Sequence, residues 1–127
     1  MNTEKGKITS FTQLNAWKEG HRLVVMVYKV VKDFPPKETF ALVNQMCRSS
    51  VSITSNIAEG FSRQSYKEKI QFYFMALGSL TELQNQLLVA RDVGYISRNI
   101  FSSLAHQSVV AHKIISGLIK KSKLFPS

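Results

Sequence analysis

Two acidic residues are the candidates for catalytic chemistry in this sequence. Glu59 and Glu82 fall in different stretches of helical apolar spacing, and we expect both side chains to be interior. Two carboxylates that converge in a folded chain can act as general acid and general base. The alternative is structural: each carboxylate would pair with a buried arginine or complete a polar contact between helices. The second role is our expectation, so we predict no enzymatic activity.

Histidine, cysteine and phosphate-binding patterns support no other chemistry. No Glu is followed by a His three positions later, so the pairs that hold di-iron centres in helical bundles are absent. His106 and His112 are six positions apart and fall on different faces of a helix, so they would not converge on a metal. Glycine-rich phosphate loops and nucleophile elbows are also absent. Cys47 occupies an apolar position, which predicts a buried, unreactive thiol. We expect no metal and no cofactor.

A stripe of polar residues is the third pattern. Five of them recur at intervals of three or four, the spacing of one helix face: Gln45, Arg48, Ser52, Asn56 and Glu59. Such a stripe can be an ordinary solvated face. Solvated faces usually carry Lys and Glu, however, and Ser and Asn are mediocre helix formers. The sharper interpretation is a packed polar seam used in assembly, which would also include Gly60, Gly78, Ser79 and Glu82.

Positive charge points most directly to a ligand. The chain has 17 Lys and Arg against 8 Asp and Glu, a net charge of +9 at pH 7, and residues 93–127 contain no acid. This charge favours binding to polyanions, and nucleic acid is the first candidate. Positive charge also aids solubility, and lysines favour the last turn of a helix. The candidate nucleic-acid contacts are Arg63, Arg98, Lys113, Lys120, Lys121 and Lys123.

Helices must position these residues, and apolar periodicity predicts four of them. The first begins at Ser10 or Thr12, both suitable N-caps, and stops at the proline pair 35–36 because proline lacks an N–H. The second spans about residues 37–59, and Gly60 is the left-handed residue that ends it. The expected inner faces of these two helices comprise Leu14, Trp17, Val24, Val27, Val31 and Phe34, then Phe40, Val43, Cys47, Val51, Ile53 and Ile57.

The third and fourth helices carry clearer end signals. Ser65 and Glu68 form a capping box, Gly94 ends the third helix, and Ser97 caps a fourth that continues to about Ser122. The small residues at 78–79 would let the second helix approach closely. The expected inner faces comprise Ile70, Phe74, Leu77, Leu80, Leu83, Leu87 and Leu88, then Ile100, Leu104, Ala111, Ile114, Ile115 and Leu118.

Four helices joined by short connections predict an all-α, antiparallel, up-down-up-down four-helix bundle. We expect residues 1–10 to form a flexible arm and residues 11–127 a single domain. The longest apolar run, Leu23 to Tyr28, is far shorter than the roughly 18 residues of a membrane span, so no membrane association is expected. One cysteine and no visible signal peptide favour a cytoplasmic location.

Apolar residues outside a single stripe predict self-association. Phe72, Tyr73 and Phe74 cannot share one face, because adjacent helix positions differ by about 100°. With Phe74 in the core, Phe72 or Tyr73 should meet a partner or a ligand. Four further residues widen the apolar surface: Leu42, Met46, Val109 and Val110.

Several short motifs, in order, resemble a known family. The run 56–60 (Asn-Ile-Ala-Glu-Gly) and the later Gly-Ser-Leu-x-Glu-Leu run at 78–83 are the most specific. Other matching residues are Trp17, Lys18, Val27, Tyr28, Phe34, Pro35, Glu38, Phe40, Gln45, Arg48, Ser52, Ile53 and Arg63. Together they resemble the four-helix-bundle family of 23S rRNA intervening-sequence proteins, over roughly Phe11 to Ile96; the fourth helix matches only in character.

The resemblance implies an antiparallel bundle that assembles into a homopentamer. Members are encoded within bacterial 23S rRNA genes or stand alone. The family is also similar to the accessory protein of diversity-generating retroelements, a basic pentameric bundle that binds nucleic acid and a reverse transcriptase. The expected function is therefore electrostatic binding of structured RNA or DNA by a non-enzymatic oligomer. The alternative is a protein-interaction scaffold, or accessory subunit, for an enzyme such as a reverse transcriptase.

Overall fold

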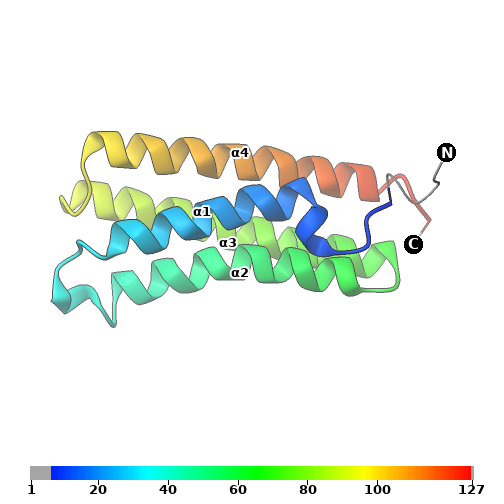
Figure 1. The fold of residues 1–127 in the computed structure, drawn as a ribbon, viewed down its shortest axis with the longest axis horizontal. Helices are drawn as coiled ribbons and strands as arrows, with labels where there is room; N and C mark the ends of the chain where they lie inside the picture. Colours follow the sequence, from blue (N-terminus) through cyan, green and yellow to red (C-terminus); the bar gives the residue numbers. More distant parts are fainter. Residues whose placement is uncertain (1–6, 127) are drawn as a thin grey trace.

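Four apolar stripes at helical spacing fold into four long helices. The computed structural model describes residues 7–126 and contains α1 (Asn15–Val31), α2 (Leu42–Ser62), α3 (Tyr66–Asp92) and α4 (Arg98–Ser122) (Figure 1). Two short 3-10 helices, η1 (Phe11–Gln13) and η2 (Pro36–Glu38), precede α1 and α2. No strand occurs between residues 7 and 126. The predicted all-α class is confirmed.

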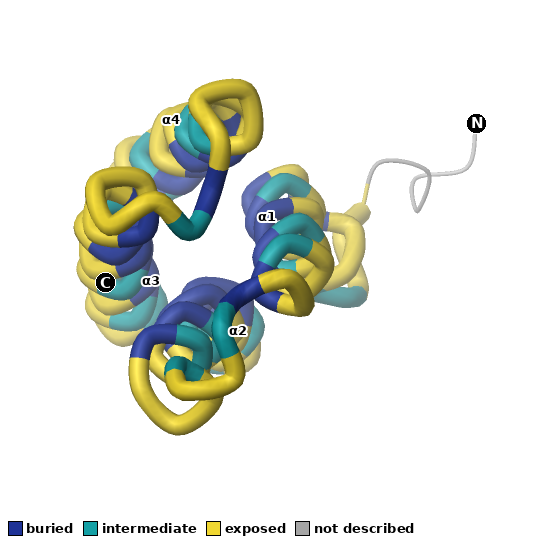
Figure 2. Tube along the Cα trace, turned by 90° about the vertical axis from the view of Figure 1, so that its left-hand side faces the viewer, coloured by how far each residue is buried: buried dark blue, intermediate teal, exposed yellow. Residues whose placement is uncertain are grey.

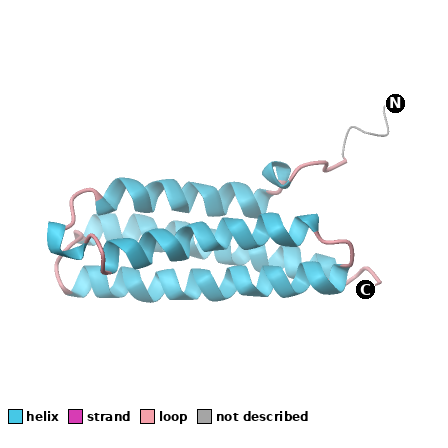
Figure 3. Cartoon of the chain, turned by 90° about the horizontal axis from the view of Figure 1, so that it is seen from below, coloured by secondary structure: helices cyan, strands magenta, loops and turns pink. Residues whose placement is uncertain are grey.

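Successive helices run in opposite directions, as short connections require (Figures 1 and 3). Each helix packs against its two neighbours in a ring, so that α1 contacts α2 and α4, and α3 contacts α2 and α4. Figure 2 looks along the bundle and shows the buried sides of the four helices facing a common centre. The up-down-up-down bundle is thus the observed architecture. Of the predicted flexible arm, residues 1–6 lie outside the described part of the chain.

The core is a layer of aliphatic side chains from all four helices. Fully buried members include Leu23, Val27, Ile53, Ile57, Leu80, Leu83, Leu87, Leu104 and Ile115. Burying one such side chain stabilises the fold by about 1.5–3 kcal/mol. The helices therefore form a fixed frame for the outward-facing residues.

Helix ends follow the sequence signals in α3 and α4. The Ser65 hydroxyl accepts the Glu68 N–H at 3.2 Å, and the Glu68 carboxylate accepts from that hydroxyl at 3.1 Å. Ser97 accepts the Ile100 N–H in the same way. Gly94 has φ +85° and ends α3, which is the left-handed conformation that glycine permits without strain.

The start of α2 differs from the prediction. After η2 the chain turns, and Ala41 has φ −121° and ψ −106°, so the helix begins only at Leu42. Glu38 holds this turn by accepting the Leu42 N–H at 3.2 Å and the Tyr95 hydroxyl at 2.9 Å. Phe40 lies on the turn and is 93% exposed, so its predicted place in the core was wrong.

The prediction that Gly60 ends α2 was wrong, because Gly60 lies inside the helix. The helix continues to Ser62, and a methyl group at Gly60 would lie 2.7 Å from Cε1 of Tyr73. The close approach of α2 and α3 therefore occurs at Gly60. The predicted approach at Gly78 was wrong, because no atom of another helix lies within 4 Å of the position a methyl group would take there.

Candidate nucleic-acid interface

The two carboxylates considered for catalysis lie on the surface. Glu59 and Glu82 are both exposed, so the expectation that they are interior was wrong. Glu59 lies 3.5 Å from the Arg63 guanidinium, and Glu82 accepts from the side-chain amide of Gln86 at 3.3 Å.

Cys47 is half-buried, and burial raises the pKa of its thiol. Between residues 7 and 126, no group of three or more His, Cys, Asp and Glu side chains is placed to hold a metal ion.

The predicted polar seam is only partly a contact between helices. The hydroxyls of Ser52 on α2 and Ser79 on α3 lie 2.8 Å apart, and Asn56 donates to the Ser52 carbonyl oxygen at 2.8 Å. Gln45 and Arg48 are exposed on the outer side of α2, so Arg48 is no buried partner for a carboxylate. The structure thus joins the small residues and leaves the long polar ones at the surface.

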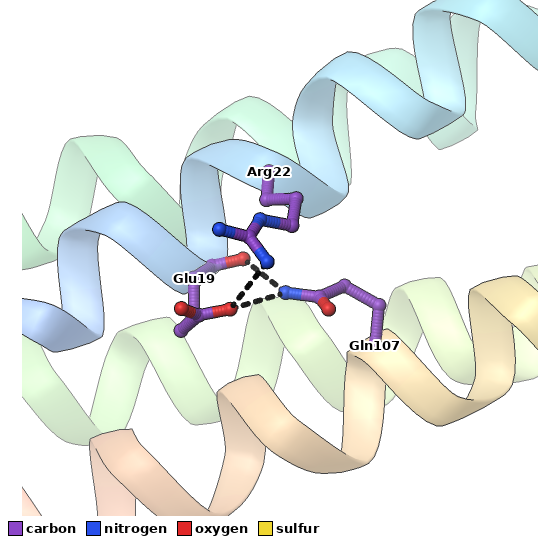
Figure 4. A network of polar contacts seen from close by, with 3 residues as sticks. All are labelled: Glu19, Arg22 and Gln107. Carbon is purple, nitrogen blue, oxygen red and sulfur yellow. Dashed lines mark hydrogen bonds and ion pairs between the residues drawn. The ribbon is translucent and has the colours of Figure 1, made fainter.

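Two buried polar contacts were missed, and both connect helices. Ser49 donates to the Gln86 side-chain oxygen at 2.7 Å between α2 and α3. Gln107 on α4 donates to the carbonyl oxygen of Glu19 at 3.0 Å and to its carboxylate at 2.9 Å (Figure 4). Arg22 lies 3.8 Å from the same carboxylate. Because an unpaired buried amide is costly, the Gln107 contact favours one register of α1 against α4.

The six candidate basic residues do not form one cluster. Arg98, Lys113 and Lys120 are exposed at positions that share the outer side of α4. Arg98 opens that helix and Lys120 lies in its last turn, which places them roughly 33 Å apart at 1.5 Å per residue. Lys121 and Lys123 lie at the end of α4. Arg63 lies elsewhere, just after α2, where its guanidinium covers the Phe72 ring at 4.6 Å.

A second basic stripe, on α1, was missed. Lys18, Arg22, Lys29 and Lys32 are exposed and recur at helical spacing along one side of α1. α1 packs beside α4, and each stripe lies on the outer side of its own helix. We call the two stripes together the α1/α4 basic face, which comprises Lys18, Arg22, Lys29, Lys32, Arg98, Lys113 and Lys120.

Acidic residues are distributed very differently from basic ones. Within α1 the one acid is Glu19, which is half-buried and bonded to Gln107, and α4 contains none. On α2, Arg48 is balanced by Glu59, and on α3 the basic and acidic residues are equal in number. The excess positive charge of the helices therefore lies on α1 and α4.

The outer side of α3 carries two pairs of exposed apolar residues. Phe74, Met75, Leu88 and Val89 are between 41% and 54% exposed, so the predicted core positions of Phe74 and Leu88 were wrong. Tyr73 is the buried aromatic at 2% exposure, and burial raises its pKa to about 12. The prediction that Leu42 and Met46 widen the surface was also wrong, because both are buried. We call Met75, Leu88 and Val89 the α3 apolar face.

No helix in the described part of the chain is long and apolar enough to cross a membrane.

Comparison with known proteins finds a matching family and a solved structure with the same fold. The sequence model of the 23S rRNA-intervening sequence proteins matches residues 12–117. A crystal structure at 1.70 Å resolution of a protein with unknown function from the S23 ribosomal protein family, from Bacteroides thetaiotaomicron VPI-5482, has 24% sequence identity and a TM-score of 0.77. The superposition covers 83% of this chain and 95% of that one, and it shows a common fold. No curated protein matches the sequence.

Proposed function

Because the chain belongs to the 23S rRNA-intervening sequence protein family, we propose that it is a non-enzymatic, homo-oligomeric bundle that binds structured RNA or DNA by electrostatic attraction. The observation that carries this proposal is the α1/α4 basic face, because the outer sides of two adjacent helices carry basic side chains with little opposing charge. Lysines and arginines that neutralise phosphates release condensed counterions, which drives association.

The dimensions of the face suit a duplex. The 25 residues of α4 extend roughly 37 Å, about one turn of a double helix. The seven residues of the α1/α4 basic face recur at helical spacing along the outer sides of the two helices, so they meet a backbone rather than converge on one base. Lysine is a hydrated point charge that carries little base specificity. We therefore expect contacts that depend on charge and shape, with weak sequence preference.

Self-association is the second part of the proposal. The residues of the α3 apolar face are exposed in the single chain, and exposed apolar residues on one side of a helix are typical of contacts between proteins. The family resemblance implies a homopentamer. Such an assembly would cover these faces, and five chains of charge +9 would give it a total charge of about +45.

The test is binding by purified protein over a series of salt concentrations. Fluorescence anisotropy with an RNA hairpin, a DNA duplex and a single strand would give Kd, and light scattering on the same sample would give the mass. If about five phosphates of the duplex are neutralised, the slope of log K against log salt should be about −4.5. Absence of binding, or affinity that does not change with salt, would contradict the proposal.

The exposed α3 apolar face also favours a second candidate, a scaffold or accessory subunit for a nucleic-acid enzyme such as a reverse transcriptase. Recovery of one stoichiometric protein partner after nuclease treatment would support it. Under this alternative, we expect light scattering to give the mass of a monomer and anisotropy to show no binding of nucleic acid.

A further inference from the structure

A pocket lies at the end of the bundle where α3 begins and the chain leaves α4, on the right in Figure 1. Its volume is about 470 Å³, within the range of small-ligand sites. The polar and aromatic side chains that line it are Tyr66, Lys67, Gln71, Phe74, Lys123 and Phe125. No acidic residue is among the lining residues.

The aromatic rings come from two segments. Tyr66 and Phe74 lie two helical turns apart on α3. After α4 the chain turns, with the Phe125 N–H donating to the Ser122 carbonyl oxygen at 3.2 Å, and this places Phe125 against Tyr66. Their ring centroids are 4.6 Å apart and the planes differ by 13°. Phe74 and Phe125 remain 50% and 46% exposed, so both can offer ring surface to a ligand.

Cations lie beside this ring surface. The Lys123 ammonium is 5.3 Å from the centroid of Phe74, and Lys67 lines another side of the pocket. Glu68, next along α3, is bonded to the Ser65 hydroxyl and does not line the pocket. The site therefore combines flat apolar rings with unopposed positive charge. Its chemical complement is a planar ring attached to an anion.

We propose that this pocket binds one unpaired nucleotide at the end of a nucleic acid strand. The base stacks on Phe74 or Phe125, and Lys67 and Lys123 contact its phosphate. Aromatic side chains accept any base because every base has a π-face. The proposal rests on the proposed function, and Lys123 of the pocket follows Lys120, the last residue of the α1/α4 basic face, by three positions along the chain.

The experiment compares a blunt RNA hairpin with the same hairpin carrying two unpaired nucleotides at its end. We expect wild-type protein to bind the second about tenfold more tightly, the usual scale of base stacking on an aromatic ring. Phe74→Ala and Phe125→Ala should each remove most of this preference and leave the Kd for the blunt hairpin unchanged. Leu124→Ala is the matched control, because Leu124 is 81% exposed beside Phe125 and does not line the pocket.

The outcomes separate this proposal from the previous one. Equal wild-type affinity for the two hairpins would overturn the nucleotide site and leave the basic face intact. No binding of either hairpin would overturn the proposed function itself. If both aromatic variants keep the preference, the pocket is not the site. If Phe74→Ala alters the mass while Phe125→Ala keeps the preference, the pocket is a contact between subunits instead.

Discussion

Two glycines on neighbouring helices have opposite surroundings. A methyl group at Gly60 would lie 2.7 Å from Cε1 of Tyr73 and 3.0 Å from Cβ of Phe72. Alanine favours a helix interior over glycine by about 1 kcal/mol, but overpacking costs about 1–3 kcal/mol. We expect Gly60→Ala to lower the free energy of unfolding, by up to about 2 kcal/mol, as measured by urea denaturation.

Gly78→Ala is the matched control, because its methyl group would meet no atom of another helix within 4 Å in the isolated chain. Here the helix preference acts alone, so the variant should be more stable by about 1 kcal/mol. A Gly60→Ala protein as stable as Gly78→Ala would show that α2 and α3 do not approach closely at Gly60.

Tyr73 should make stability depend on pH in the alkaline range. Burial raises its pKa in the folded protein from 10.0 to about 12, so the folded state keeps the proton that the unfolded chain releases. This contribution is complete below pH 10 and is lost as the pH rises toward 12. Between pH 9 and pH 11, wild type should lose about 1.3 kcal/mol of unfolding free energy relative to Tyr73→Phe.

The comparison isolates one group. Lys69 has a pKa lowered by burial, which gives the opposite trend, but both proteins retain it. Urea unfolding at several pH values gives the difference directly. Parallel curves for the two proteins would mean that the Tyr73 phenol titrates as it does in the unfolded chain.

At the scale of helices, end signals were more predictable than faces. Ser65, Ser97 and Gly94 act locally, through hydrogen bonds or a φ value within a few residues, and their roles could be predicted from the sequence. The role of Gly60 depends on Tyr73, which lies on the next helix, so the sequence alone suggested an ordinary C-cap. The turn before α2 likewise depends on Tyr95, far along the chain, which bonds to Glu38.

The predicted inner side of α3 was partly wrong because this helix carries a second set of apolar residues outside its buried stripe. Tyr73, Ala76, Leu80, Leu83 and Leu87 form the buried stripe. The exposed Phe74 and Leu88 keep the same spacing one position later, so periodicity alone did not distinguish the two stripes. Exposed apolar residues on the outer side of a helix are typical of a protein–protein contact, and this leads to a prediction for α3.

Val89→Glu should lower the mass of the assembly toward the 14.4 kDa of a single chain. Val89 is 42% exposed on the α3 apolar face, and an unpaired carboxylate in an apolar contact costs at least about 2 kcal/mol. Light scattering gives the mass, and circular dichroism checks that the helices remain.

Val25→Glu is the matched control, since Val25 has the same side chain, is 39% exposed and lies on the outer side of α1. Its mass should equal that of wild type. An unchanged mass for Val89→Glu would exclude α3 as the contact between copies, and a reduced mass for Val25→Glu would move the contact to α1.

For the molecule as a whole, the position of the charge matters more than its sum. The excess of basic residues toward the C-terminus could be predicted, because no acid follows Val93. The contribution of α1 could not, since all of the acids lie in residues 1–92 and conceal it in a count along the chain. Folding separates these groups: the charges of α2 and of α3 balance within each helix, while α1 and α4 lie side by side.

Reversal of charge on two faces tests this arrangement. Lys29→Glu with Lys113→Glu changes one residue on each helix of the α1/α4 basic face, and Lys37→Glu with Arg48→Glu changes the net charge equally on η2 and α2. If the face contacts phosphates, the first variant should lose affinity for every duplex tested, and the slope of log K against log salt should become less steep by about 2. The second variant should lose only the weaker, long-range attraction and keep the wild-type slope. Equal losses in the two variants would mean that net charge alone governs binding, and the nucleic acid would then have no preferred side of the bundle.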